Sequence, residues 1–293
     1  MLLEEKNFLL AIEHAAPEEK RSLIHALEFA KKAHEGQMRK SGDPYVIHVI
    51  DVSRVLWEKF HDLDLAIGGM LHDTVEDVEE VTMEQIYKDF GENVGFIVDA
   101  ASKDEKSFYL YPKEYFEDKI ERQLWAGMKD IRALLVKIAD RDHNLSTLKH
   151  LQSHKQIRMA FETQAIYKPM RDITNFDSTD SIKEMSTSLH NFLTSKNIST
   201  PEAFKNALFE TYFDKLEQQL YGLIYNDSSN IIWEIEDYTL YETLINSEDF
   251  NINTETISLN LRDNHFSASF YFKKGLLIHQ KNTKLKIHTF KQS

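Results

Sequence analysis

The stretch LHDTVED, residues 71–77, places a histidine and three carboxylates directly behind the apolar run LDLAIGGM. Neighbouring residues on a helix point about 100° apart, so His72 and Asp73 can both lean towards one ion. Glu76 and Asp77 lie one helical turn further along. Three acids this close repel one another strongly unless a cation neutralises them. The stretch therefore predicts a metal site beside a helical core.

Two other positions extend this pattern. His48 lies in SGDPYVIHVIDVSRVLWEKF (41–60), and Asp140 follows the apolar run of LLVKIADRDHN (134–144). An unpaired carboxylate behind such a run would cost several kcal/mol. A lone His-Asp pair or a single histidine is usually structural, but the joint pattern on three separate helices predicts four ligands of one metal. Two imidazoles and two carboxylates suit Mn²⁺, and Fe²⁺ or Zn²⁺ would also fit.

Composition and charge limit the class of protein. A chain of 293 residues with 42% hydrophobic and 28% charged residues is typical of one or two globular domains. Only 9 Gly and 5 Pro favour long helices, and the absence of cysteine excludes disulfides and thiolate metal sites. The net charge of −13 disfavours general nucleic-acid binding. The acidic start and the lack of a membrane-length apolar run lead us to expect a cytoplasmic protein without a membrane partner.

Residues 17 to about 175 are predicted to form successive helices. The first, PEEKRSLIHALEFAKKAHEGQ (17–37), has one shared face that contains Leu23, Leu27, Ala30 and His34. The last three are EYFEDKIERQLWAGM (114–128), DIRALLVKIADRDHNLSTLKHL (130–151) and SHKQIRMAFETQAIYKPM (153–170).

Capping patterns predict where two more helices begin. Asp43 is expected to cap a helix with Pro44 at its first position. Thr82, followed by Gln85, has the capping-box spacing at the start of TMEQIYKDFG, and Gly91 lies near the end of that segment.

The pattern changes after residue 171. The polar, turn-prone segment TNFDSTDS (174–181) indicates a boundary, and a helix is predicted over 201–224. β-rich runs follow at 231–236, 256–261, 266–272, 276–280 and 284–290. We therefore predict a mainly α domain over 1–175 and a small α+β C-terminal extension with an antiparallel sheet over 181–293.

Four motifs carry a family resemblance: RKSGDPYVIHV (39–49), LHDTVEDVEEVTMEQIYKDFG (71–91), DIRALLVKIADRDHNLSTLKHL (130–151) and ETQAIYKPM (162–170). The order His…His-Asp…Asp resembles that of the HD metal-dependent phosphohydrolases. The motifs are similar to the hydrolase domain of the Rel/Spo alarmone enzymes over about residues 20–175. The resemblance implies a helical fold, a Mn²⁺ cofactor and removal of pyrophosphate from the 3′ position of (p)ppGpp.

The resemblance also implies roles for individual residues. Glu76 and Asp77 match the family's catalytic pair, which would orient a water, accept its proton and protonate the leaving oxygen. Arg39 matches a residue that stacks on the guanine, as guanidinium planes readily do, and Lys40 and Ser41 lie beside it.

A second group of nucleotide contacts falls in 130–151. Asn144 and Thr147 match the family's base and ribose contacts, and both share a helix face with Asp140. Two positions depart from the family pattern: Asp142 stands where an apolar residue is usual, and Ser146 where an arginine is usual. The missing arginine affects the expected phosphate affinity, or the preference between tetra- and pentaphosphate.

The sequence thus predicts a monofunctional, Mn²⁺-dependent (p)ppGpp hydrolase that produces GDP or GTP. After Ser181 only Gly222 and Gly275 occur, so the extension has no glycine-rich phosphate loop, and no segment resembles a synthetase domain. We expect the extension to be an accessory or homo-oligomerisation unit. Two alternatives stay open: hydrolysis of another purine nucleotide (an adenosine alarmone or the 2′-phosphate of NADPH), or a nucleotide-binding regulator with little turnover.

Overall fold

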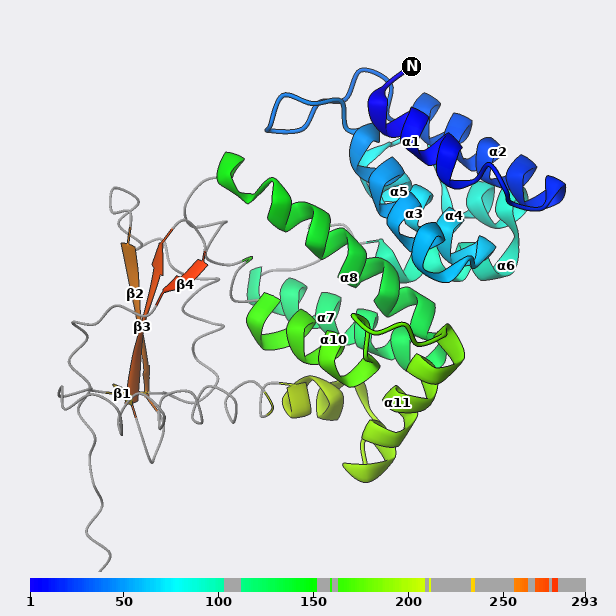
Figure 1. Ribbon diagram of the computed structural model, residues 1–293. Helices are drawn as coiled ribbons and strands as arrows, with labels where there is room; N and C mark the ends of the chain where they lie inside the picture. The colour runs from blue at the N-terminus through cyan, green and yellow to red at the C-terminus, as the bar shows by residue number, and fades with distance from the viewer. Residues whose placement is uncertain are drawn as a thin grey trace, which may run out of the picture.

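The computed structural model describes residues 1–102, 112–151, 159, 163–208 and 211, together with four short strands towards the C-terminus. Up to residue 208 the described chain is helical, which confirms the mainly α prediction (Figure 1). The α-helices are α1 (Leu3–Ala11), α2 (Pro17–Ala33), α3 (Val46–Phe60), α4 (Leu63–Leu71), α5 (Thr74–Asp77), α6 (Met83–Ala101), α7 (Pro112–Lys129), α8 (Ile131–Ser146), α10 (Lys168–Thr174) and α11 (Ile182–Ser195). A 3₁₀ turn, η2 (Leu148–His150), and a π-helical turn, η3 (Thr163–Tyr167), lie between α8 and α10, and residues 201–208 are also helical.

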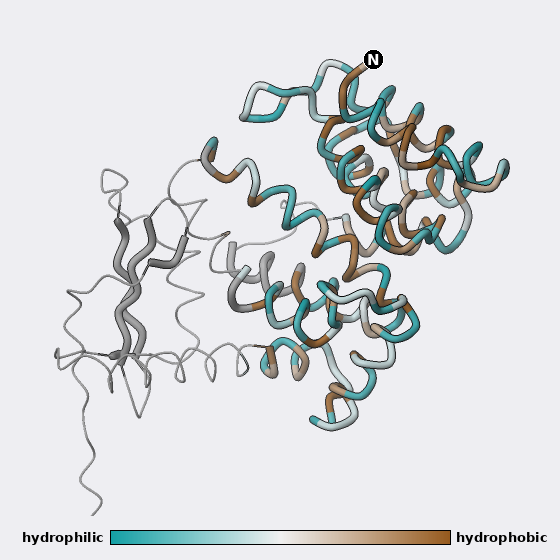
Figure 2. Tube along the Cα trace, viewed as in Figure 1, coloured by the Kyte–Doolittle hydropathy of each residue, from teal (hydrophilic) through white to brown (hydrophobic). Residues whose placement is uncertain are grey.

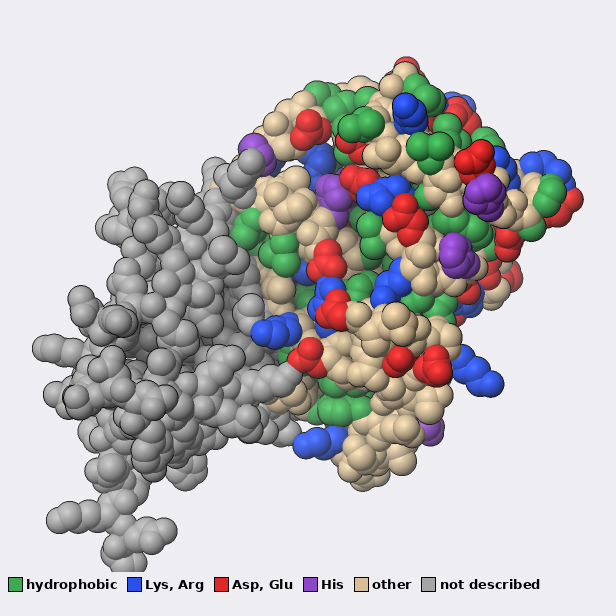
Figure 3. Space-filling view, in the orientation of Figure 1, with side chains coloured by type: hydrophobic (Ala, Val, Ile, Leu, Met, Phe, Trp, Pro, Cys, Tyr) green, Lys and Arg blue, Asp and Glu red, His purple; other side chains and the backbone are tan. Residues whose placement is uncertain are grey.

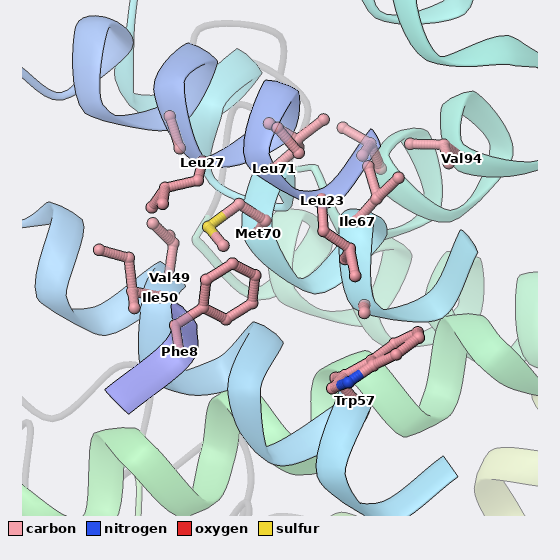
Figure 4. Close-up of a cluster of buried hydrophobic side chains, with 14 of the residues drawn as sticks. Phe8, Leu23, Leu27, Val49, Ile50, Trp57, Ile67, Met70, Leu71 and Val94 are labelled. Atoms are coloured by element: carbon pink, nitrogen blue, oxygen red, sulfur yellow. The ribbon is translucent and has the colours of Figure 1, made fainter. Parts of the chain in front are cut away.

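One apolar core joins the first six helices. Phe8 of α1, Leu27 of α2, Ile50 of α3 and Met70 of α4 are all fully or almost fully buried and converge in Figure 4. The predicted face of α2 points into this core, since all four of its members are buried. Figure 2 shows the same arrangement as apolar segments turned towards one another.

The helix α8 connects this core to the rest of the helical body. It contacts α3, α4 and α6 on one side and α7 and α11 on the other (Figure 1). Most of its first nine residues are buried, including Leu134, Leu135 and Val136. Among the described residues, none of the helices combines the length and the apolar character of a membrane span.

The two glycines of α4 allow it to pack unusually close to its neighbours. A Cβ atom added to Gly68 would lie 2.5 Å from Cγ2 of Ile97 in α6, and one added to Gly69 would lie 2.6 Å from Cδ1 of Leu56 in α3. Such distances leave no room for a side chain. The packing fixes the end of α4, which leads directly into His72.

The start predicted for α3 at Asp43 is wrong, because α3 begins later, at Val46. Residues 39–43 form a tight turn instead. The N–H of Arg39 donates to the carbonyl of Asp43 (2.8 Å), and Gly42 has a φ of +91°, which suits glycine. The turn folds Arg39 back over the start of α3. The predicted cap of α6 is confirmed, since Thr82 Oγ1 accepts from the N–H of Gln85 (3.2 Å).

The helical body continues beyond the predicted boundary at 174–181. That segment does form a turn, after which Ser181 and Glu184 cap α11 through a capping box. The helix α11 packs against α8 and α10, and Phe204 and Leu208 are fully buried. The division of the chain into domains at 175–181 stays a prediction.

The described strands are β1 (Trp233–Glu234), β2 (Thr256–Arg262), β3 (Ser267–Lys273) and β4 (Leu276–Ile278). The strand β3 pairs antiparallel with each of the others, with Ser258 of β2 opposite Tyr271. The fifth predicted run, 284–290, and residues 212–224 of the predicted helix lie outside the described residues. That the extension forms an α+β unit stays a prediction.

Candidate metal centre

Three parts of the fold bring the four predicted ligands together. His48 comes from the first turn of α3, His72 and Asp73 from the junction of α4 and α5, and Asp140 from α8. The Nε2 atom of His48 lies 3.4 Å from Oδ2 of Asp73 and 3.2 Å from Oδ1 of Asp140. The Nε2 atom of His72 lies 3.3 Å and 3.6 Å from the same two oxygens. The side chains therefore point at one common position.

The sequence treats His72 and Asp73 as neighbours on a helix, and both have right-handed helical backbone angles, but the regular helix is interrupted at these two residues. The helix α4 ends at Leu71, and α5 is a single turn that begins at Thr74. Two side chains form hydrogen bonds with backbone carbonyls at the end of α4. Nδ1 of His72 bonds the carbonyl of Gly69 (2.8 Å), and Oγ1 of Thr74 donates to the carbonyl of Leu71 (2.7 Å). This break directs Nε2 of His72 and the carboxylate of Asp73 to the same side.

The chemistry of this cluster fits a divalent cation. The ligand atoms of His48, His72 and Asp140 all lie within 4.8 Å of one another. Nε2 of His72 is buried and has no hydrogen-bond partner among the described residues, which is costly for a polar atom. A mixed set of imidazole nitrogens and carboxylate oxygens is one that first-row divalent metals accept.

The electrostatics of the cluster also favour a positive charge. Burial lowers the pKa of His72, but the carboxylates of Asp73 and Asp140 outweigh it and raise that pKa to about 10. Burial opposes ionisation of Asp73 and Asp140, yet the imidazoles hold the pKa of both carboxyl groups well below the usual range. The site thus stabilises a cation between one buried carboxylate, Asp73, and one half-buried carboxylate, Asp140.

The predicted acid pair lies immediately beside the ligands. Glu76 and Asp77 are on α5, where the N–H of Asp77 donates to the carbonyl of Asp73 (2.9 Å). The amide of Gln37 donates to the carbonyl of Asp77 (2.8 Å) and ties α5 to the turn after α2. One carboxylate oxygen of Glu76 is buried.

The predicted nucleotide contacts fall on two segments that meet across the site. Nη2 of Arg39 donates to Oδ1 of Asn144 (2.6 Å), and Nδ2 of Asn144 donates to Oδ1 of Asp140 (2.5 Å). Thr147 Oγ1 donates to the carbonyl of Asn144 (3.3 Å). Lys40 is exposed on the turn that carries Arg39. The Ser41 hydroxyl beside it is buried without a hydrogen-bond partner among the described residues.

Tyr45 and Lys137 belong to the site, although the sequence did not point to them. The hydroxyl of Tyr45 donates to Oδ2 of Asp73 (2.7 Å). Burial, and then the charges of Asp73 and Asp77, raise the pKa of Tyr45, which keeps it a donor. The ammonium of Lys137, itself buried, lies 4.0 Å from Oδ2 of Asp140. A lysine inside the apolar run of α8 was the signal that could have identified it.

His34 contacts the ring of Tyr45, and Gln37 contacts His34. The imidazole of His34 stacks on the Tyr45 ring (centroids 4.8 Å apart), and its Nδ1 lies 2.8 Å from Oε1 of Gln37. Burial lowers the pKa of His34, which favours its neutral form. A histidine on the apolar face of α2 was the sequence signal for this contact.

The two positions that depart from the family pattern do not join the ligand cluster. Asp142 accepts two hydrogen bonds from Nη1 of Arg171 in α10 (2.6 Å and 2.7 Å), and Arg171 also pairs with Asp177. Ser146 Oγ donates to the backbone carbonyl of His143 (2.6 Å). The ion pair between Asp142 and Arg171 therefore links α8 to α10. Ser146 has no positive charge to offer a phosphate, unlike the arginine that is usual at this position.

Comparisons with known proteins concern the same part of the chain. Residues 26–172 match the family model described as HD domain. The chain is 40% identical over 167 residues to a protein of Oryza sativa subsp. japonica named putative GTP diphosphokinase RSH1, chloroplastic, covering 55% of this chain and 19% of that one. It is 41% identical over 141 residues to a Vibrio cholerae protein named guanosine-3′,5′-bis(diphosphate) 3′-pyrophosphohydrolase, covering 48% and 20%. The chain spans about a fifth of the length of these relatives.

A solved structure shows a weaker similarity. It is described as a metazoan ortholog of SpoT that hydrolyzes ppGpp and plays a role in starvation responses. It is 24% identical to this chain, with a TM-score of 0.42, and the match covers 61% of this chain and 97% of that one.

Proposed function

Because the chain belongs to the HD-domain family, we propose that it is a metal-dependent (p)ppGpp 3′-pyrophosphohydrolase without synthetase activity. The observation that carries this proposal is the convergence of His48, His72, Asp73 and Asp140, with the Glu76-Asp77 turn beside them. The similarity to a protein named for this reaction supports the choice of substrate. The products would be pyrophosphate and GDP or GTP.

The four candidate ligands are proposed to hold Mn²⁺, which would act as a Lewis acid on the phosphoryl oxygens and would lower the pKa of a bound water. The Glu76-Asp77 pair would orient the attacking water, accept its proton and return that same proton to the leaving oxygen. The hydrogen bond from Tyr45 to Asp73 holds one ligand carboxylate in place. The ammonium of Lys137 lies near Oδ2 of Asp140, whereas the imidazoles face Oδ1, and it partly neutralises that carboxylate.

Nucleotide binding is proposed to require one rearrangement. Asn144 accepts a hydrogen bond from Arg39, so the two proposed nucleotide contacts are bonded to each other. The guanidinium of Arg39 can stack on a guanine through its face while its edge stays bonded to Asn144. To bind the base, Asn144 would exchange its contact with Arg39 or with Asp140. Lys40 and Ser41 lie beside Arg39 on the same turn, and Thr147, directly before η2, would contact the ribose.

A panel of nucleotides tests this function. Purified protein with Mn²⁺ should release pyrophosphate from ppGpp and pppGpp, and a chelator should stop the release. The Asp73→Ala variant should bind no Mn²⁺ and should release no pyrophosphate. Mn²⁺ binding without release from either guanosine nucleotide would reject the proposal, and formation of (p)ppGpp from ATP and GDP or GTP would reject the absence of synthetase activity.

A second candidate keeps the reaction type and changes the nucleotide. Ser146 occupies the position of a family arginine, and its hydroxyl is turned to a backbone carbonyl. A site with one cation fewer would suit a substrate with less phosphate charge, such as NADPH. An adenosine alarmone, which differs from ppGpp in its base, is the other candidate nucleotide. Faster turnover of either one in the same panel would favour this candidate.

The remaining proposals concern the cellular setting. We propose a cytoplasmic protein that acts on a small nucleotide and binds no nucleic acid, in line with its net charge of −13. Acidic and basic side chains are interspersed on the face shown in Figure 3. The extension over 181–293 is proposed to act as an accessory or homo-oligomerisation unit, which light scattering of the full chain would test.

A further inference from the structure

We propose that Asp51 and His143 form an outer relay that sets the ring tautomer of His48 and thereby its capacity to bind the metal. This inference rests on the proposed function, because it takes His48 as a metal ligand. Asp51 and His143 would be positioning residues that contact neither metal nor substrate.

The relay is visible as a chain of contacts between α3 and α8. Nε2 of His48 faces Asp73 and Asp140, while its Nδ1 lies 2.8 Å from Nδ1 of His143. On the far side of the His143 ring, Nε2 lies 3.7 Å from Oδ2 of Asp51. The imidazole of His143 therefore stands between a ligand and a carboxylate.

The tautomer of each ring follows from which of its nitrogens donates a hydrogen bond and which accepts one. A neutral imidazole has one N–H donor and one nitrogen acceptor. If Nε2 of His48 offers its lone pair to a metal, its proton is on Nδ1 and is donated to Nδ1 of His143. That nitrogen must be the acceptor, so the proton of His143 is on Nε2, the atom that faces Asp51. A carboxylate at that position stabilises this tautomer and opposes the other one.

The second imidazole of the cluster shows why His48 needs this arrangement. Nδ1 of His72 bonds the carbonyl of Gly69 (2.8 Å), and a carbonyl can only accept. The tautomer of His72 is thus set by its backbone partner alone. The partner of His48 is a histidine, which can accept or donate, so a further group must decide between the two states.

Asp51 is held in the position that the relay requires. Nε and Nη2 of Arg54 both lie 3.3 Å from Oδ1 of Asp51, which leaves Oδ2 for His143. Burial opposes ionisation of Asp51, but the contacts with His143 and Arg54 outweigh it and lower its pKa. His48, Asp51 and Arg54 follow one another at three-residue steps on α3, so α3 supplies both ends of the relay and α8 supplies His143 between them.

The first test measures Mn²⁺ affinity by calorimetry. His143→Leu removes the acceptor, and Asp51→Asn presents an amide that can donate to His143 and favour the wrong tautomer. Both should weaken binding by about 10–100-fold, the usual effect of losing an outer partner of a metal ligand. His143→Gln restores an acceptor and should recover most of the affinity. It also covers the case in which His143→Leu fails to fold.

Asp64→Asn is the matched control. Its carboxylate is similarly shielded, with 31% of the side chain exposed against 25% for Asp51, and it pairs with Arg132 (3.1 Å) at the start of α4. This variant loses an ion pair without touching the relay. Its affinity for Mn²⁺ should equal that of the unmodified chain.

The second test reads the tautomers directly. In Zn²⁺-loaded protein with ¹⁵N-labelled histidine, the proton of His143 should be on Nε2, and Asp51→Asn should shift it towards Nδ1. A proton on Nδ1 of His143 in the unmodified chain would overturn the relay.

The affinities separate the two proposals. If His48→Ala binds Mn²⁺ as tightly as the unmodified chain, the ligand assignment fails and the proposed function fails with it. If His48→Ala loses Mn²⁺ but Asp51→Asn and His143→Leu keep full affinity, the relay alone is wrong.

Discussion

The acidic residues of the site differ in what surrounds them, and this separates their roles. The carboxylates of Asp73 and Asp140 face the two imidazoles and are held ionised by them. Glu76 lies on α5, three residues after Asp73, and its proposed role is proton transfer and not ligation.

We expect Glu76→Gln to spare Mn²⁺ binding and to lose turnover. The amide keeps the size of the side chain but cannot accept a proton from water, so kcat should fall by about 10²–10⁴-fold. Pyrophosphate release and calorimetric Mn²⁺ binding would be measured side by side. An active Glu76→Gln protein would show that Glu76 is not the base.

His72 predicts a pH dependence of stability in the metal-free protein. Its pKa is raised in the folded state from 6.5 to about 10, so the folded state binds the proton more tightly. The resulting stabilisation is complete below pH 6.5 and is lost as the pH rises through about 10. The free energy of unfolding in urea, measured with a chelator, should therefore fall across this range.

His72→Gln is the control for that measurement. Other titrating groups remain in this variant, so the difference between the two proteins isolates His72. Saturating Mn²⁺ should also remove the fall, because a metal ligand must be a neutral imidazole. An equal slope in His72→Gln would mean that His72 is not the group responsible.

At the scale of elements, the end of α4 is placed by its contact with α6. Gly68 lies against Ile97, and the backbone of α4 approaches α6 more closely than any side chain would allow. The break after Leu71 then aims His72 at the ligand cluster. Packing between helices thus controls the geometry of the site.

We expect Gly68→Ala to destabilise the protein by about 1–3 kcal/mol, because its Cβ would overlap Cγ2 of Ile97. Chemical unfolding would measure the loss. Ile97→Ala removes that atom, at a cost of about 2–5 kcal/mol for the cavity.

The double variant tests the assigned cause of the Gly68→Ala effect. If the overlap is responsible, Gly68→Ala with Ile97→Ala should be more stable than the sum of the single effects predicts. Strict additivity would locate the effect of Gly68→Ala elsewhere in α4.

At the scale of the whole molecule, the residues after 175 complete the helical body. In the part of this segment that the structure describes, six apolar residues are buried: Phe176, Met185, Leu189, Phe204, Ala207 and Leu208. Lys205 also pairs with Glu121 of α7 (2.5 Å). The helices α7, α8 and α10 therefore all have contacts with this segment.

We expect a fragment of residues 1–175 to unfold or aggregate, and one of residues 1–211 to fold. The shorter fragment loses six buried apolar residues, of which the five larger than alanine are worth about 2–5 kcal/mol each, against a typical total stability of about 5–15 kcal/mol. Circular dichroism melting curves of both fragments would decide this. A cooperative transition in 1–175 would instead support a domain boundary at 175–181.

The sequence anticipated the parts of the site that local spacing encodes. His48, His72-Asp73 and Asp140 were identified because polar groups beside apolar runs need partners. The buried face of α2 followed from its helical periodicity. The start of α3 was predicted wrongly, because the turn from Arg39 to Asp43 competes with capping at Asp43, and local propensity does not rank the two.

The sequence by itself determined the helical class, the family and the identity of the candidate ligands, since all three depend on patterns within short segments. The tertiary structure decided the rest. In the folded protein the helix is interrupted between α4 and α5. Tyr45 and Lys137 lie beside the carboxylates of the candidate ligands. His143 contacts His48, which is 95 residues earlier in the chain. Such contacts depend on which helix faces meet in the packed core, and no spacing within a segment records that.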